Sequence, residues 1–157
     1  MTPFDRLRAF LSSSPRQTFV AFPFAVLLFE LLTRRRVRID AKWLPFLVTG
    51  YTLYRGAGRY RARMDAGTPG FERPPQRLLT DGPYALSRNP MYLGHLIFMT
   101  ALVMATRSRL AAILALRQYL RFSERISIDE RRLERIFGDD YRAYVARVPR
   151  WIGLPKR

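Results

Sequence analysis

The chain contains no cysteine and only one histidine, His95. Without cysteine, the protein can have no disulfide, no thiolate nucleophile and no thiolate-ligated metal. One histidine without cysteine also leaves too few ligands for a typical transition-metal site, so we expect no bound metal. Any chemistry must rely mainly on carboxylates, guanidinium groups, hydroxyls and the backbone.

Acidic residues are scarce as well. Twelve Asp and Glu stand against 28 Lys and Arg, and the formal net charge is +16. Such an excess is typical of proteins that bind nucleic acid or an anionic membrane surface. Here the arginines flank apolar runs and do not form one basic stripe with interleaved aromatic residues, which disfavours a nucleic-acid binder. We expect anionic lipid headgroups as partners and no nucleic acid.

Hydrophobic residues make up 48% of the chain and gather in blocks. The four blocks are Thr18–Thr33, Trp43–Tyr54, Asn89–Thr106 and Leu110–Phe122. A helix needs about 20 apolar residues to cross a bilayer, and Asn89–Thr106, which has no Lys, Arg, Asp or Glu, comes nearest to that length on its own. The pattern predicts an all-α integral membrane protein with about four membrane helices.

A polar turn, Leu79–Ser87, opens directly onto the longest apolar block. A polar turn at the mouth of a membrane-length helix indicates a site at the boundary between water and lipid. Beyond the last block, Ser127 and Glu130 fit a capping box, which predicts that a new helix begins at Ser127. We expect Gly138 to end this helix and Asp140–Val148 to form a second short amphipathic helix.

The two stretches together resemble the isoprenylcysteine carboxyl methyltransferase and phospholipid methyltransferase superfamily. Arg88-Asn89-Pro90-Met91-Tyr92-Leu93-Gly94 resembles the Arg-His-Pro-x-Tyr-x-Gly segment of that family, and Asp129-Glu130 resembles its later acidic pair. The resemblance runs in order from about Gly67 to Trp151. Asn89 stands in place of the family's histidine and Asp129 in place of its first glutamate, which puts the acceptor in doubt more than the cofactor.

The resemblance implies an integral membrane enzyme that transfers a methyl group from S-adenosylmethionine to a lipophilic acceptor, such as a lipid or an isoprenoid. Transfer from a sulfonium is an in-line displacement that needs no metal, so alignment supplies much of the acceleration. By position, the resemblance assigns catalytic roles to Arg88, Tyr92 and Glu130. It assigns cofactor binding to Leu79, Tyr84, Asn89, Pro90, Tyr92, Gly94, Asp129 and Glu130.

These residues also have structural interpretations. The acidic pair would cap a helix, Arg88 would bind lipid phosphate, Tyr84 and Tyr92 would belong to an interfacial aromatic belt, and Gly94 would serve helix packing. We expect Tyr141 and Tyr144 to pack the C-terminal helices. The need for a general base depends on the acceptor, and Glu130, Tyr84, Arg125 and, less favourably, His95 are all candidates.

Under this interpretation residues 1–55 are anchoring helices, 56–87 a cytoplasmic connection and 88–157 the catalytic core of a single domain. Basic Arg6 and Arg8 precede the first block without a small-residue cleavage site, which favours a retained membrane helix. Four spans place the site on the cytoplasmic side of the inner or plasma membrane, but also place Arg34–Arg36 outside, which the positive-inside rule disfavours. An alternative is that the first two blocks are less regular than simple membrane spans.

Two other functions stay open. A related membrane reductase shares the C-terminal helices of the family, although nothing in the sequence favours it and the chain is short for one. A non-enzymatic membrane protein would keep the fold without turnover, given Asn89 and Asp129. The sequence does not indicate an oligomeric state.

Overall fold

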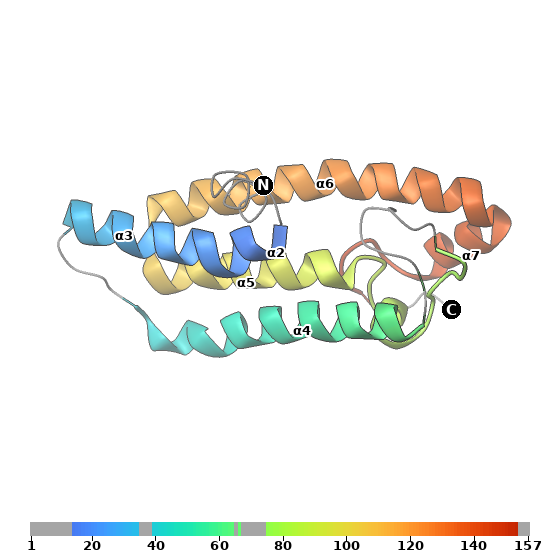
Figure 1. Ribbon diagram of the computed structural model, residues 1–157, viewed down its shortest axis with the longest axis horizontal. Helices are drawn as coiled ribbons and strands as arrows, with labels where there is room; N and C mark the ends of the chain where they lie inside the picture. The colour runs from blue at the N-terminus through green and yellow to red at the C-terminus, as the bar shows by residue number, and fades with distance from the viewer. Residues whose placement is uncertain (1–13, 35–38, 65, 67–74, 154–157) are drawn as a thin grey trace, which may run out of the picture. The chain divides into compact units, whose positions relative to one another are not determined.

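The computed structural model describes residues 14–34, 39–64, 66 and 75–153, and most of these are helical (Figure 1). In chain order the helices are α2 (Ser14–Arg16), the π-helical turn η1 (Gln17–Ala21), α3 (Phe22–Arg34), the 3-10 turn η2 (Ala41–Trp43), α4 (Leu44–Arg63), the 3-10 turn η3 (Gly82–Ala85), α5 (Pro90–Thr106), α6 (Arg109–Phe137) and α7 (Asp139–Arg147). These residues contain no strand, so the prediction of an all-α protein is confirmed. The basic residues Arg6, Arg8, Arg35 and Arg36 lie outside the described part.

Two compact units divide the chain. Unit 1 consists of the residues up to Tyr51 together with His95–Tyr119, and unit 2 consists of Thr52–Gly94 together with the residues from Leu120 onward. The predicted division into anchoring helices, connection and catalytic core concerns function, and it stays a prediction.

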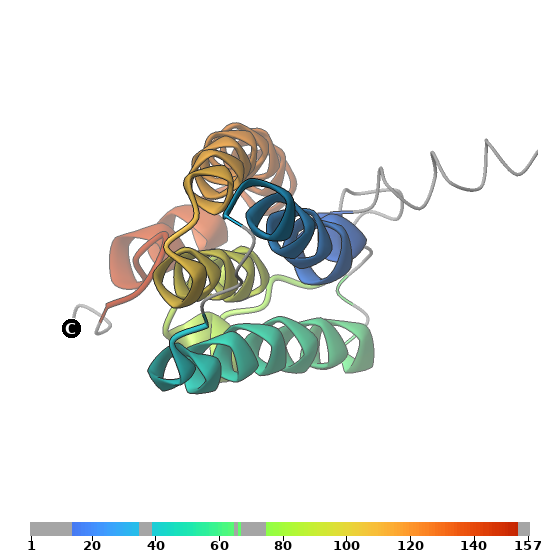
Figure 2. The ribbon, with the colours of Figure 1, turned by 90° about the vertical axis from the view of Figure 1, so that its left-hand side faces the viewer.

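The core of unit 1 joins α3, α5 and α6, which run side by side in this unit (Figures 1 and 2). Leu47 of α4 packs against a buried cluster made of Phe22, Val26, Met99, Leu102 and Ala111. Nearby, the Phe19 ring stacks on His95 with 4.8 Å between the centroids. His95 is only 3% exposed, as expected of a packing residue.

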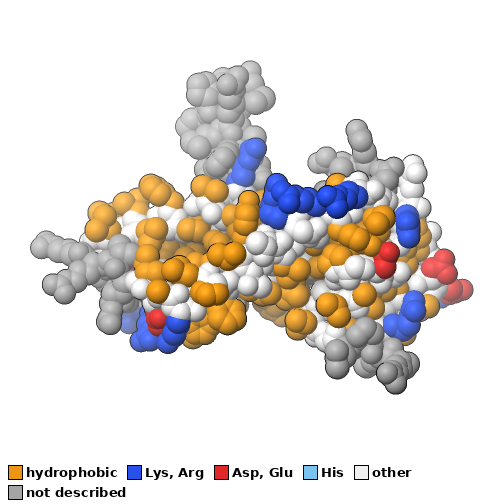
Figure 3. Space-filling view, turned by 90° about the horizontal axis from the view of Figure 1, so that it is seen from below, with side chains coloured by type: hydrophobic (Ala, Val, Ile, Leu, Met, Phe, Trp, Pro, Cys, Tyr) orange, Lys and Arg blue, Asp and Glu red, His pale blue; other side chains and the backbone are white. Residues whose placement is uncertain are grey.

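Large apolar side chains are exposed on the helices of unit 1. They include Phe24, Leu28, Leu31 and Leu32 on α3, Phe46 and Val48 on α4, and Ile113 and Leu116 on α6. Figure 3 shows hydrophobic side chains over much of the one face that it draws. Large exposed apolar surfaces are typical of regions that contact lipid or another protein. This surface agrees with the prediction of a membrane helical protein.

Among the described residues, one helical stretch is long and apolar enough to cross a membrane, and it is Ser14–Thr33. The prediction that Asn89–Thr106 comes nearest to span length is therefore wrong. The helix α5 has only 17 residues, because it begins at Pro90, a residue suited to the first helical position, and the chain turns at Arg107 with a positive φ of 49°. The stretch Ser14–Thr33 is longer than the apolar block Thr18–Thr33, because α2 and the first residue of η1 extend the helix toward the N-terminus.

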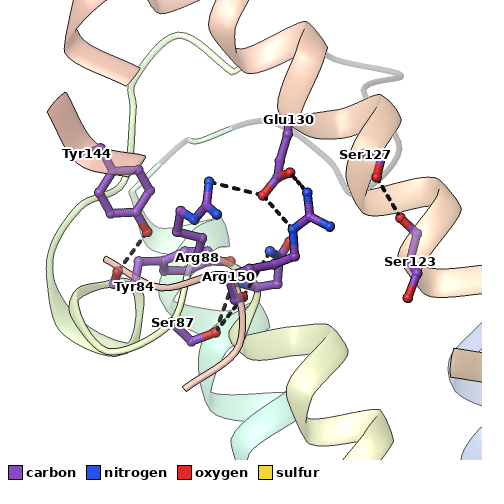
Figure 4. A network of polar contacts seen from close by, with 9 residues as sticks. Tyr84, Ser87, Arg88, Ser123, Ser127, Glu130, Tyr144 and Arg150 are labelled. Carbon is purple, nitrogen blue, oxygen red and sulfur yellow. Dashed lines mark hydrogen bonds and ion pairs between the residues drawn. The ribbon is translucent and has the colours of Figure 1, made fainter. Parts of the chain in front are cut away.

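The helix α6 is continuous over 29 residues. The prediction that a helix begins at Ser127 is wrong, because Ser127 lies inside α6 and its Oγ donates to the carbonyl of Ser123 at 3.0 Å (Figure 4). A serine four residues after a carbonyl makes this bond in mid-helix, so the S-x-x-E pattern alone does not define a cap. No Pro or Gly lies between the last apolar block and Ser127, so no residue there interrupts the helix.

The end of α6 agrees with the sequence. The helix stops at Phe137, and Gly138 follows with a φ of +53°, a conformation that favours glycine. The predicted second short helix is confirmed as α7, which begins one residue earlier than predicted, at Asp139.

We expect Ser127→Ala to leave the stability unchanged or to raise it by about 0.5 kcal/mol, because alanine has the higher helix propensity. An N-capping serine would lose about 1 kcal/mol on the same substitution. Thermal unfolding of the detergent-purified protein measures the difference. A loss of that size would mean that a helix does begin at Ser127.

Candidate functional site

The turn before α5 is anchored by a small core in unit 2. Leu79 and Tyr84 are each 6% exposed and lie in a buried cluster with Ala66, against which Tyr60 and Met64 pack. The N–H of Tyr84 donates to the carbonyl of Asp81 at 3.0 Å, which closes η3. Both Leu79 and Tyr84 thus hold the turn in place, and their predicted contact with a cofactor stays a prediction.

Gly82 starts this turn with a φ of +55°, and a Cβ there would lie 2.8 Å from Cζ of Tyr60. Both the backbone conformation and the nearness of the Tyr60 ring exclude a side chain. The turn that precedes the site therefore depends on a glycine at this position.

The chain after α7 returns to the turn before α5 (Figure 4). The N–H of Arg88 donates to the carbonyl of Pro149 at 3.0 Å. The carbonyl of Arg150 accepts from Ser87 Oγ at 3.4 Å and from Asn89 Nδ2 at 3.2 Å. The Asn89 amide, which the resemblance assigns to the cofactor, therefore also ties the C-terminal segment to the turn.

The hydroxyl of Tyr144 makes a further connection, since it donates to the carbonyl of Tyr84 at 2.7 Å. Tyr141 and Tyr144 form a buried cluster with Val148, against which Leu133 and Phe137 pack. Burial raises the pKa of Tyr141 to about 12, so its hydroxyl stays protonated at neutral pH. The prediction that Tyr141 and Tyr144 pack the C-terminal helices is confirmed.

Glu130 on α6 lies between two arginines (Figure 4). Its Oε1 is 3.1 Å from Nη1 of Arg88 and accepts from Nε of Arg150 at 3.3 Å, while its Oε2 pairs with Nη2 of Arg150. The side chains of Glu130 and Arg88 are 15% and 12% exposed, whereas that of Arg150 is 40% exposed. One mostly buried carboxylate thus faces two guanidinium groups.

A second pair lies one residue earlier on α6. The hydroxyl of Tyr92 donates to Oδ2 of Asp129 at 3.3 Å, and the Tyr92 ring packs against Phe122 with 4.8 Å between the centroids. Burial raises the pKa of Asp129 above its ordinary value, although Arg125 and other arginines favour the charged form. The phenol of Tyr92 on α5 and the carboxylate of Asp129 on α6 thus connect the two helices.

The structure therefore brings the two halves of the predicted site together. Arg88 meets Glu130 and Tyr92 meets Asp129, although the members of the second pair are 37 residues apart in the chain. Pro90 and Gly94, both buried on α5, complete this region, and their contact with a cofactor stays a prediction. No group of three or more His, Cys, Asp or Glu that could hold a metal occurs among the described residues.

Sequence reasoning missed Arg150. It directly follows Pro149, and nothing in the neighbouring sequence distinguishes it from the many other arginines of the chain. One weak signal was available. Acidic residues are scarce in this strongly basic chain, so an arginine partner could have been expected for Glu130.

Comparison with known proteins shows the family of the chain. The phospholipid methyltransferase family matches residues 60–140, just over half of the chain. The chain therefore belongs to this family, within the superfamily that includes the isoprenylcysteine methyltransferases. Arg88, Tyr92, Asp129 and Glu130 lie inside the matched residues, and Arg150 lies outside them.

Two curated relatives match a similar part of the chain. The chain is 37% identical to a protein-S-isoprenylcysteine O-methyltransferase of Schizosaccharomyces pombe over 78 residues, which are 49% of this chain and 33% of the relative. It is 35% identical to protein-S-isoprenylcysteine O-methyltransferase B of Arabidopsis thaliana over 74 residues, which are 46% of this chain and 38% of that protein. The chain therefore spans about a third of the first relative and 38% of the second. No solved structure matches it with significance.

We expect Gly82→Ala to destabilise the protein by about 1–3 kcal/mol, because alanine is strained at this φ and its Cβ meets Tyr60. Gly56→Ala is the matched control, since Gly56 lies in α4 and a Cβ there has nothing within 4 Å. The control should gain up to about 1 kcal/mol in helix propensity. Equal stability of both variants in thermal unfolding would show that the turn tolerates a side chain.

The raised pKa of Asp129 predicts a pH dependence. The folded protein holds this proton more tightly than the unfolded chain, so its contribution to stability is full below the ordinary pKa of 3.8 and is lost as the pH rises through the raised, folded-state pKa. Asp129→Asn removes this loss and keeps an oxygen that can accept from Tyr92.

The measurement is the unfolding temperature of both proteins from about pH 4 to pH 8. Stability of the wild type should fall, relative to Asp129→Asn, as the pH rises over this interval. Parallel curves would show that Asp129 titrates alike in the folded and unfolded states.

Proposed function

We propose that the protein transfers a methyl group from S-adenosylmethionine to a lipophilic acceptor at the membrane interface. The observation that carries the proposal is the meeting of Arg88 with Glu130 and of Tyr92 with Asp129. Membership of the phospholipid methyltransferase family, and similarity to proteins named as O-methyltransferases, support it.

The residues of this region fit the methyl donor. The amino-acid end of the donor carries an ammonium and a carboxylate, for which Glu130 and Arg88 offer opposite charges. Asp129 is suited to the ribose hydroxyls, and the first backbone N–H groups of α5, near Pro90, are suited to an anionic group. When bound, the donor supplies an electrophilic methyl group on a sulfonium.

The contribution of the protein is then mainly alignment. A displacement at a methyl group requires the attacking atom in line with the leaving sulfur, and fixed orientation can supply about 7–11 kcal/mol of the barrier. Arg88 in the turn before α5, Tyr92 on α5 and Glu130 on α6 would provide this orientation, and Arg88 and Tyr92 already contact α6 through Glu130 and Asp129. A carboxylate acceptor would need no general base, whereas an amine or a hydroxyl would have to lose a proton.

The membrane arrangement follows from the same interpretation. We infer membrane segments in Ser14–Thr33, α4, α5 and the first part of α6, with the exposed apolar side chains of unit 1 facing lipid. The basic residues at the end of α4, among them Arg59, Arg61 and Arg63, suit a cytoplasmic side with anionic headgroups. The lipophilic acceptor would reach the site from the bilayer.

Calorimetric titration of the detergent-purified protein with S-adenosylmethionine tests the proposal. We expect a Kd on the order of micromolar for the wild type, and at least a tenfold increase, about 1.4 kcal/mol, for Glu130→Gln. Glutamine keeps the size of the side chain and removes its charge, so unfolding temperatures measured in parallel separate binding from folding.

Glu124→Gln is the matched control, because Glu124 is an exposed residue of the same helix. It should bind the donor as the wild type does. A folded wild-type protein that binds no S-adenosylmethionine would overturn the proposal and favour a membrane protein that keeps the fold without the chemistry.

A further inference from the structure

Arg150 connects three segments of unit 2 through two separate groups. Its backbone carbonyl accepts from Ser87 and Asn89 in the turn before α5, and its side chain pairs with Glu130 on α6 (Figure 4). The backbone contacts fix the position of the segment after α7 whatever side chain residue 150 carries. The guanidinium is therefore presented to Glu130 from a fixed point.

The two arginines do not hold Glu130 in the same way. Arg88 reaches Oε1 with Nη1 alone, and its buried Nε has no hydrogen-bond partner among the described residues. Arg150 reaches both carboxylate oxygens, with Nε on Oε1 and Nη2 on Oε2. A two-point contact from a planar guanidinium fixes the plane of a carboxylate, which a single contact cannot do.

Arg150 is also set apart by its place in the chain. It lies beyond the residues 60–140 that match the phospholipid methyltransferase family, near the end of the stretch that resembles the superfamily. It is the more exposed of the two arginines, at 40% against 12%. Glu130 would keep a charged partner in Arg88 if the Arg150 side chain were lost, and a substitution at residue 150 need not strand a buried charge.

We propose that Arg150 is a positioning residue, whose guanidinium holds the Glu130 carboxylate in the orientation that binding of the methyl donor requires. The segment after α7 thereby becomes part of the donor site. This inference rests on the proposed function and extends it to a residue that contacts the site only through Glu130.

The test measures the Kd for S-adenosylmethionine, and the unfolding temperature without it, for Arg150→Ala and Arg150→Lys. We expect about a tenfold increase in Kd for the alanine variant and partial recovery for lysine, whose ammonium pairs with the carboxylate but cannot form the two-point contact. Arg135→Ala is the matched control. Arg135 is an exposed arginine of α6 whose Nε donates to the carbonyl of Arg131 at 3.3 Å. Its substitution removes the same charge and should leave the Kd unchanged.

A double-mutant cycle with Glu130→Gln separates positioning from a general effect. If Arg150 acts through Glu130, Arg150→Ala should weaken binding no further in the Glu130→Gln background. Additive effects, a Kd unchanged or lowered in Arg150→Ala, or full recovery of binding by lysine would overturn the inference while the proposed function stands. Absence of binding by the folded wild type would instead overturn the proposed function, and this inference with it.

Discussion

The pairing of Glu130 with Arg88 and Arg150 is the interaction on which the rest of unit 2 depends. A mostly buried carboxylate is strongly destabilising unless charged and hydrogen-bonding partners surround it. Those partners come from the turn before α5 and from the segment after α7, far from α6 in the chain. The turn must therefore present Arg88, the C-terminal segment must return to that turn, and α6 must continue unbroken past residue 130.

The two units answer different physical demands. Unit 1 buries a small apolar core between its helices and leaves other apolar side chains exposed, an arrangement that is favourable in lipid and costly in water. Unit 2 contains Asp129 and Glu130, their tyrosine and arginine partners, and the buried cluster of Tyr141 and Tyr144. Many of its contacts are therefore polar and directional. Such contacts can hold a polar ligand in one orientation, which an apolar core alone cannot do. A methyl transfer to a lipophilic acceptor needs both kinds of surface.

Local signals in the sequence predicted some elements well and others poorly. Gly138 marks the predicted helix end, because glycine permits a backbone conformation with positive φ at its own position. Ser127 misled, because a serine with a glutamate three residues later makes good bonds either at a helix start or within a helix. The length of the first membrane stretch was also misjudged, since the helix continues through residues outside the apolar block and hydropathy does not record helix continuity.

The sequence by itself determined the helical class, the clustering of apolar residues, the excess of arginine and the family motif around Arg88 and Glu130, because all of these are properties of residue type and local spacing. Tertiary structure alone decided which arginines hold Glu130 and where the Asn89 amide donates. It also decided that Tyr92 meets Asp129. Among so many arginines every pairing is chemically equivalent in the sequence, and only the return of the chain after α7 brings Arg150 within reach of the Glu130 carboxylate.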